Sequence, residues 1–247
     1  MARADQLLVE SGLAASRTAA QRLIAAGRVS WSGGVVKKPA LDLPPETALS
    51  VTSDPEDRFV SRGGLKLAGA LAETGISVTD KRCLDVGQST GGFSDCLLQA
   101  GASHVVGVDV GHGQLSRRLF GEARLSSIEG INCRSLMTAD LAEHFPASGF
   151  DLIVGDVSFI SMTLILPQLP ALLADCGDIL VLIKPQFEVG PGNVGKNGIV
   201  RDPALYGEVE SKLRQCAGTL GLEVRAWLDS PITVGDGNRE FFIWLKK

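Results

Sequence analysis

The amino-acid sequence predicts an α/β fold, in which a largely parallel sheet is covered by helices and preceded by a small α+β domain. Two short runs of Leu, Ile and Val, residues 150–155 and 178–183, are apolar along nearly their whole length. Such runs suit parallel strands that helices cover on both faces. Asp156 follows the first run and Lys184 the second, and ligands of open α/β sheets bind outside the carboxyl ends of the strands. An acid and a base at that edge indicate chemistry, although a helix cap and a solvated loop lysine would show the same spacing.

Length and composition fit one large domain, or a large domain with a small one: 247 residues, 45% hydrophobic and 21% charged. The five cysteines show no C-x-x-C spacing and the three histidines are scattered. We therefore expect reduced thiols, no metal site and a cytoplasmic location. No signal peptide is apparent, and the longest uncharged run, residues 157–174, contains Pro167 and Pro170, which favours a loop and a core-facing helix over a membrane span.

The first 40 residues form a basic head. They hold six Lys or Arg against two Asp or Glu, a charge of +4, whereas the whole chain carries −4. This asymmetry suggests a polyanion as the partner of the head, although a solvated helix face produces it too. We expect the head to span residues 1–56, a linker 57–63, and the α/β domain 64–247.

Within the head, turn and cap residues separate the predicted elements. Ser16 is a good N-cap and Gly27 a good C-cap for the second of two helices. A hairpin is expected around Ser32-Gly33-Gly34. The predicted elements are helices over residues 3–15 and 17–26, hairpin strands over 28–31 and 35–38, and a last strand over 49–52.

The phrase Ser16-Arg17-x-x-Ala20-x-x-Leu23-Ile24-x-x-Gly27-x-Val29 resembles the small RNA-binding domain first seen in a ribosomal small-subunit protein, the alpha-L motif. The resemblance implies side chains that face RNA phosphates and sugars, because a helix N-terminus with guanidinium groups makes a phosphate site. These are Arg3, Ser16, Arg17, Gln21, Arg22 and Lys37. Each arginine taken alone would equally suit a solvated surface.

The α/β domain begins with a helix that runs to about Thr74 and carries Lys66 in its first turns, a position that the helix dipole disfavours. A strand at 82–86, a glycine-rich turn, a helix at 93–100 and a strand at 105–108 follow, and Asp109 ends the last of these. This order is typical of nucleotide binding: the glycines allow close backbone approach and the acid pairs with ribose hydroxyls.

The turn is Asp85-x-Gly-x-Ser-x-Gly-Gly, with Ser89 where the dinucleotide motif has its second glycine. It resembles the first motif of class I methyltransferases that bind S-adenosylmethionine, whereas an ordinary β-α turn is the alternative. The resemblance implies a set of cofactor-binding residues, with Asn132 near the adenine end. The set is Asp85, Gly87, Ser89, Gly91, Gly92, Phe93, Asp109, Asn132 and Asp156.

The rest of the chain completes seven predicted strands with a terminal hairpin. The four glycines between residues 185 and 200 favour a mobile loop over the site. Asp202-Pro203 begins a helix and Gly221 ends it. The further strands are expected at residues 128–133, 223–228 and 241–245.

Four ionisable residues complete the resemblance: the series Lys66, Asp156, Lys184 and Glu240, here called the tetrad. With Ser61-Arg-Gly-Gly-x-Lys, Asp156-Val-Ser-Phe-Ile-Ser, Lys184-Pro-Gln-Phe-Glu and Gly237-Asn-x-Glu, the tetrad is similar to the TlyA family of FtsJ-like ribose 2′-O-methyltransferases. The fold implied is a seven-stranded class I (Rossmann-like) methyltransferase sheet with a small N-terminal α+β RNA-binding domain. Gln88 departs from the pattern, which has a small residue there.

The family resemblance implies S-adenosylmethionine as the methyl donor, no metal, and a cytidine ribose of ribosomal RNA as the acceptor. Because both chain ends are short, the large ribosomal subunit is the favoured partner; no membrane is expected and the oligomeric state stays open. Two other functions remain possible: an RNA-binding ribosome-assembly module without catalysis, and a haemolysin, as some family names suggest.

A ribose hydroxyl is a weak acid and needs its proton removed as it attacks a methyl group, and a lysine accepts a proton only when its pKa falls from about 10.4 toward neutrality. The hypothesis is that Lys184 is the base and that Lys66 is a like charge that favours the neutral amine and holds the hydroxyl. Asp156 and Glu240 then orient the lysines and keep the net charge near zero. An ordinary salt-bridge network is the alternative.

Overall fold

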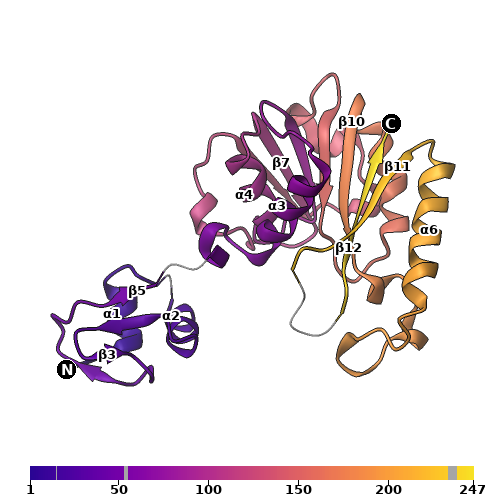
Figure 1. Cartoon of the computed structure of the whole chain (residues 1–247). Coiled ribbons are helices and arrows are strands. Elements are labelled where there is room, and N and C mark those ends of the chain that lie inside the picture. The colour runs from indigo at the N-terminus through magenta and orange to yellow at the C-terminus, as the bar shows by residue number, and fades with distance from the viewer. Residues whose placement is uncertain (15, 53–54, 233–237) are drawn as a thin grey trace. The chain divides into compact units, whose positions relative to one another are not determined.

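A computed structural model describes residues 1–14, 16–52, 55–232 and 238–247 of the chain, so Gly237 of the tetrad motif lies outside the described residues. The chain divides into two compact units, Met1–Asp57 and Arg58–Lys247 (Figure 1). Most of the expected linker, residues 57–63, lies in the second unit. Phe59 is buried there, and a Cβ on Gly64 would lie 2.4 Å from its ring.

The first unit holds two helices and five short strands. The elements are β1 (Ala2–Arg3), α1 (Ala4–Glu10), α2 (Arg17–Ala25), β2 (Val29–Trp31), β3 (Gly34–Val35), β4 (Asp42–Leu43) and β5 (Ser50–Val51). β1 pairs with β4, and β3, β2 and β5 form a second sheet. The first helix is shorter than predicted, because the Ser11 hydroxyl donates to the Leu7 carbonyl (2.7 Å) and Gly12 turns the chain at φ +74°.

The second unit is a seven-stranded sheet with helices on both faces. Its elements are α3 (Arg62–Thr74), β6 (Arg82–Val86), α4 (Gly92–Gln99), β7 (His104–Asp109), β8 (Leu125–Glu129), α5 (Thr138–Leu141), β9 (Phe150–Gly155), β10 (Leu173–Ile183), α6 (Leu205–Thr219), β11 (Glu223–Asp229) and β12 (Phe241–Lys246). The strand order is β11-β12-β10-β9-β6-β7-β8. β12 is antiparallel to both of its neighbours, and the other pairs are parallel. The seven-stranded Rossmann-like sheet with a terminal hairpin is therefore confirmed.

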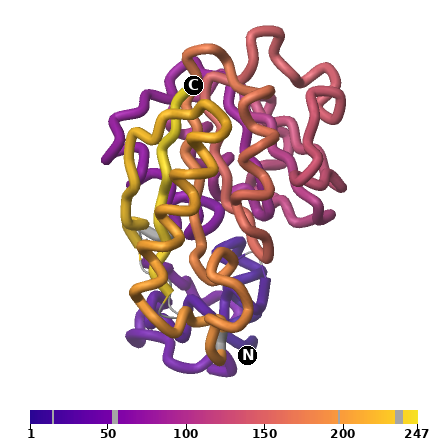
Figure 2. The backbone as a smooth tube through the Cα atoms, turned by 90° about the vertical axis from the view of Figure 1, so that its right-hand side faces the viewer, coloured from indigo at the N-terminus to yellow at the C-terminus, as the bar shows by residue number. Residues whose placement is uncertain are grey.

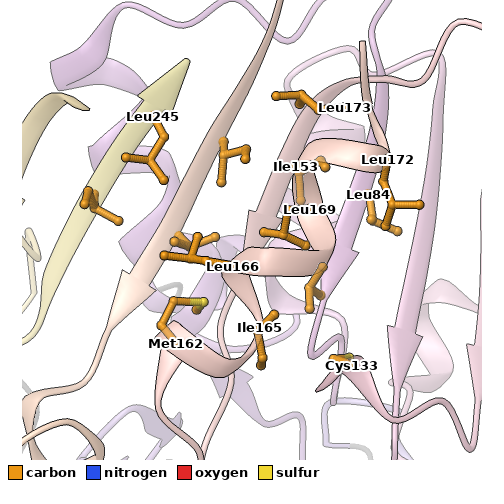
Figure 3. Close-up of a cluster of buried hydrophobic side chains, with 14 of the residues drawn as sticks. Leu84, Cys133, Ile153, Met162, Ile165, Leu166, Leu169, Leu172, Leu173 and Leu245 are labelled. Atoms are coloured by element: carbon orange, nitrogen blue, oxygen red, sulfur yellow. The ribbon is translucent and has the colours of Figure 1, made fainter. Parts of the chain in front are cut away.

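Successive side chains of each strand point to opposite faces of the sheet, so the core consists of two layers. On one face, Leu84, Ile153 and Leu245 pack against α6 and two 3-10 helices, Met162–Leu164 and Leu166–Ala171. Figure 3 shows Leu166 and Leu169 of the second short helix over the strands, and Figure 2 shows α6 alongside the outer strands. On the other face, α3 and α4 cover the sheet, for example through Leu67 and Leu97. Residues 157–172 thus form a loop and core-facing turns, with 3-10 rather than α geometry, and residues 173 and 174 already belong to β10.

Further details of the second unit differ from the sequence prediction. β10 begins at Leu173, five residues before the start of the strand expected at 178–183. The strand expected at 128–133 is β8, Leu125–Glu129; the chain then turns at Gly130 (φ +77°), and Asn132 caps a 3-10 turn at Cys133–Ser135. The short helix α5 was not predicted at all. Among the described residues, no helix combines the length and the apolarity needed to cross a bilayer.

Candidate active site

The tetrad is brought to one edge of the sheet by strand register. Asp156 directly follows β9 and Lys184 directly follows β10, and these strands run parallel side by side. β12 runs the other way, and its Phe241 pairs with Ile183. Glu240, one residue before β12, therefore stands opposite Lys184, one residue after β10.

The four side chains form two ion pairs. Lys184 Nζ lies 2.5 Å from Asp156 Oδ1 and donates to Ser158 Oγ at 2.9 Å. Lys66, from the second turn of α3, places its Nζ 2.5 Å from Glu240 Oε2. The Glu240 side chain is 3% exposed, whereas that of Asp156 is 22% exposed. The Asp156 pair is thus the more accessible one.

A cavity of about 500 Å³ opens beside the Asp156 pair. It lies between the residues that follow β6, β7 and β9, where the chain order reverses across the sheet, the usual ligand position in such folds. Its lining is Gly87, Ser89, Asp109, Val110, Gln114, Asn132, Cys133, Arg134, Asp156, Val157, Ser158, Phe159, Ile160 and Ile165.

A smaller, more polar cavity of about 210 Å³ adjoins it and shares Gly87, Ser89, Asp156 and Ser158 with it. Lys184 lines this second cavity, together with Ser61 and Gly63 at the start of α3 and Gly92 at the start of α4. Asp156 faces both cavities. The acid of the Asp156–Lys184 pair therefore stands between a larger ligand space and the base.

The glycine-rich loop after β6 is held from outside by Asp109. One carboxylate oxygen of Asp109 accepts from the Ser89 backbone N–H and the other from the Gly111 N–H, both at 2.7 Å. Ser89 has φ +46°, a left-handed conformation that costs free energy in a non-glycine residue. Gly87 (φ +83°) is required for another reason: a Cβ there would lie 2.8 Å from the Asp156 carbonyl oxygen.

The same loop is held from inside by a chain of hydrogen bonds that begins at exposed Ser127 and continues through buried side chains. Ser127 donates to the Gln88 amide oxygen, the Gln88 amide donates to Ser94 Oγ (2.8 Å), and Ser94 donates to Asp85 Oδ2 (2.7 Å). Burial raises the pKa of Asp85 to about 7; the Ser94 hydrogen bond opposes the shift and the charge of Asp156 adds to it. Gly107 makes room for this glutamine, since a Cβ there would lie 2.0 Å from Gln88 Nε2.

Comparison with known proteins decides the family. Residues 59–247 match the FtsJ-like methyltransferase family, and residues 2–48 match the S4 domain. The chain is 43% identical to "16S/23S rRNA (cytidine-2'-O)-methyltransferase TlyA" of Mycobacterium tuberculosis over 99% of this chain and 90% of that protein. The chain belongs to the TlyA family of FtsJ-like methyltransferases.

Two further comparisons agree with this membership of the TlyA family. A "23S rRNA (cytidine-2'-O)-methyltransferase TlyA" of Campylobacter jejuni is 33% identical over 76% of this chain and 71% of its own length. A solved structure from Streptococcus thermophilus, named "Putative hemolysin", is 40% identical with a TM-score of 0.75, covering 100% of this chain and 88% of that one. The family makes the chain a methyltransferase enzyme, and the basic head lies almost wholly within the match to the S4 domain.

The site fits S-adenosylmethionine, the donor of this methyltransferase family. The larger cavity has the volume of a small-molecule site, and its wall combines apolar residues such as Val110 and Ile165 with polar ones such as Ser89 and Asn132. Each Asp109 oxygen accepts one hydrogen bond from a backbone N–H and has a second lone pair that can accept from a ribose hydroxyl. No group of three His, Cys, Asp or Glu side chains that suits a metal ion is found among the described residues.

The structure distributes the predicted cofactor residues over three positions. Gly87, Ser89, Asp109, Asn132 and Asp156 line the larger cavity, and Gly92 and Phe93 line the smaller one. Asp85 and Gly91 lie behind the wall. Asp85 is fully buried below the loop, and Gly91 (φ +86°) turns the chain where a Cβ would lie 2.4 Å from Leu119.

The head residues predicted to face RNA differ in their surroundings. Arg22 and Lys37 are exposed, and Ser16 caps α2 by accepting from the Ala19 N–H (3.2 Å). Arg3, Arg17 and Gln21 instead converge on the carboxylate of Asp5. The sequence analysis did not single out Asp5.

The sequence analysis assigned no role in the site to three further residues, although it noted Gln88 as a departure from the family pattern. Ser158 holds Lys184, Gln88 anchors the loop, and Phe159 exposes 92% of its surface at the rim of the larger cavity. Phe159 has φ +65° and its ring lies 5.3 Å from that of Phe187. A signal was present for two of them, since Ser158 and Phe159 belong to the motif that begins at Asp156.

Proposed function

We propose that the protein transfers a methyl group from S-adenosylmethionine to the 2′-hydroxyl of a cytidine in ribosomal RNA. One observation carries the proposal: the Lys184–Asp156 pair stands at the junction of two cavities, with Lys66–Glu240 at the same sheet edge. A two-lysine, two-carboxylate site suits the removal of a proton from an alcohol. The names of the TlyA relatives, which specify cytidine 2′-O-methylation, support the same reaction.

The larger cavity would hold the donor. Asp109 would accept hydrogen bonds from its ribose, and Asn132 and Val110 would border the base. S-Adenosylmethionine supplies a methyl group made electrophilic by the positive sulfur. Asp156, which lines both cavities, would mark the side on which the acceptor enters.

Lys184 is the proposed general base. Its Nζ faces the smaller cavity and would take the proton of the ribose hydroxyl, while Asp156 and Ser158 hold the amine in place. Lys66, fixed by buried Glu240, would hold the hydroxyl oxygen from the other side. Lys184 acts as the neutral amine, and once it has taken the proton the site holds two ammonium and two carboxylate groups, whose charges sum to zero.

RNA is the proposed partner, and the exposed ring of Phe159 at the cavity rim would stack on a nucleobase. The M. tuberculosis name specifies both 16S and 23S RNA and the C. jejuni name only 23S. Large-subunit RNA, common to both names, is therefore the first substrate to test. A ribosomal RNA substrate places the proposed reaction in the cytoplasm.

The decisive experiment is methyl transfer from labelled S-adenosylmethionine to separated ribosomal subunits from a strain that lacks the enzyme, with ribose methylation mapped by resistance to alkaline cleavage. Lys184→Ala should lower kcat by about 100-fold or more, the usual contribution of a general base. Lys81→Ala is the matched control, because Lys81 pairs with Asp178 at the opposite edge of the sheet. Full turnover by the Lys184 variant would refute the assignment.

The same material tests the non-catalytic alternative, an RNA-binding assembly module. S-Adenosylmethionine at a hundred times its Kd should add about 2.7 kcal/mol to the stability of a protein that binds it. A thermal shift of that size with no methyl transfer to either subunit would favour the module or a different acceptor. Transfer of the methyl group to a ribose 2′-hydroxyl excludes the non-catalytic module.

A further inference from the structure

The head unit contains a buried carboxylate that two arginines share. Asp5, in the first turn of α1, is 0% exposed, yet the arginine side chains around it are 40% (Arg3) and 54% (Arg17) exposed. Arg3 donates through Nε (3.0 Å) and through a terminal nitrogen (3.1 Å), one to each oxygen of Asp5. Arg17 donates to Asp5 Oδ2 at 3.1 Å.

Gln21 completes the cluster. It lies one helical turn after Arg17 on the same face of α2, and its amide donates to Asp5 Oδ2 at 3.0 Å. These donors lower the pKa of Asp5 well below its ordinary value; the Arg3 hydrogen bonds contribute most, and burial opposes them. Asp5 therefore stays charged, and the two arginines leave a net charge of +1 at the surface.

The arrangement leaves the arginines able to bind a second anion. A guanidinium has five N–H donors, of which Arg3 uses two and Arg17 one on the carboxylate. Each side chain donates through a terminal nitrogen to the same oxygen, Asp5 Oδ2, so these two nitrogens lie close together. Arg17 is also the first residue of α2, where the helix dipole disfavours a cation, and the carboxylate of Asp5 offsets that cost.

We propose that Asp5 is a positioning residue for RNA binding: it holds Arg3 and Arg17 as a preformed pair that grips one phosphate of the RNA backbone. This inference rests on the proposed RNA substrate. Without Asp5, two long side chains regain their rotamer freedom and repel each other, and both effects must be overcome on binding. Asp5 thus strengthens the attraction of a polyanion although it carries a negative charge itself.

The test compares two variants that raise the net charge by the same amount. Asp5→Asn removes the shared carboxylate, and Asp42→Asn removes an exposed carboxylate in β4, opposite Arg3 in the β1–β4 ladder. The full chain is titrated with an unmodified large-subunit RNA transcript by filter binding, at salt concentrations from about 50 to 200 mM. Circular dichroism at the assay temperature confirms that each variant is folded.

Asp5→Asn should weaken binding on the order of tenfold and reduce the slope of log K against log salt by about one phosphate contact. Asp42→Asn should bind as tightly as the wild type or tighter, with an unreduced slope. Equal tightening by both variants would overturn the proposal, since it is the result expected if only net charge matters. If the wild type itself shows no salt-dependent binding, the proposed RNA substrate is wrong as well. Failure of the Asp5 proposal alone is recognised by a wild type that does bind.

A charge-conserving variant keeps the proposal testable should Asp5→Asn unfold the head. Arg17→Lys retains the formal charge on an exposed position, but an ammonium lacks the fork that can bond Asp5 and a phosphate together. The Arg17→Lys variant should bind the RNA severalfold more weakly than the wild type. Adding Asp5→Asn to it should weaken binding only a little further. An Arg17→Lys variant that binds like the wild type, or losses that add fully in the double variant, would contradict a pair acting through Asp5.

Discussion

Replacing Asp85 by Asn should change how the stability of the catalytic unit depends on pH. Asp85 is fully buried under the glycine-rich loop; Ser94 donates to its Oδ2, and its Oδ1 has no hydrogen-bond partner among the described residues. Burial raises its pKa from 3.8 to about 7. Since one pKa unit is about 1.36 kcal/mol, the shift corresponds to on the order of 4 kcal/mol.

The sign follows from counting protons. Between pH 3.8 and about 7 the folded protein keeps the Asp85 proton, whereas the unfolded chain has released it. The folded state binds more protons there, so the wild type loses stability as pH rises through this window and levels off above it. The asparagine of the variant does not titrate, and any packing cost it has is the same at every pH. The stability of the variant relative to the wild type should therefore increase with pH.

The assay is thermal unfolding of the cofactor-free protein at several pH values. For a unit of this size, 1 kcal/mol shifts Tm by roughly 2–4 °C. The Tm of Asp85→Asn relative to wild type should thus rise by roughly 10 °C between about pH 4 and pH 8. Asp175→Asn, which removes an exposed carboxylate of the same unit, is the control. A difference in Tm that stays constant across this range would refute the argument.

Three further predictions concern the cofactor loop and the cavity. Gly107→Ala should weaken S-adenosylmethionine binding, measured by calorimetry, because its Cβ displaces the Gln88 amide. Adding Gln88→Ala should restore most of the lost affinity. A double variant that binds as weakly as Gly107→Ala alone would contradict this coupling. Asp109→Ala should raise the cofactor Kd at least about tenfold, through the loss of charge-assisted hydrogen bonds and of support for Ser89, and an unchanged Kd would contradict its role. Phe159→Ala should raise the KM for RNA about tenfold, because stacking on one base contributes roughly 1–3 kcal/mol, and Phe159→Leu, which cannot stack, should do the same; an unchanged KM would remove Phe159 from the RNA site.

The sheet was predictable because its strands have a strong local signal. The mostly apolar run at residues 150–155 agrees in its bounds with β9, and the strand expected at 82–86, before the glycine-rich turn, agrees with β6. The strand predicted at 128–133 was placed wrongly, because Ile128 and Ile131 both pack against the core although the chain turns between them at Gly130. An apolar pattern records burial, and here burial continues after the strand has ended.

The partners of the charged residues were not predictable. The sequence places Lys66, Asp156, Lys184 and Glu240 at element ends, but which lysine meets which carboxylate depends on strand order and on the antiparallel return of β12. Asp5 was missed for a related reason. A carboxylate two residues after an arginine resembles an ordinary solvated pair, and its burial depends on Arg17 and Gln21 arriving from another helix.

The motif Lys184-Pro-Gln-Phe-Glu188 shows how the catalytic pair is held in place. Glu188, 9% exposed, accepts from the Met162 backbone N–H and from Ser161 Oγ, both at 2.6 Å, and its side chain lies 2.9 Å from Lys212 of α6. Ser161 and Met162 end the segment that begins at Asp156. One end of the motif therefore supplies the amine, while the other end fastens the segment that carries its carboxylate partner. The 2.5 Å approach of Lys184 to Asp156 is thus supported by hydrogen bonds among Ser161, Met162 and Glu188, and none of these three residues lines either cavity.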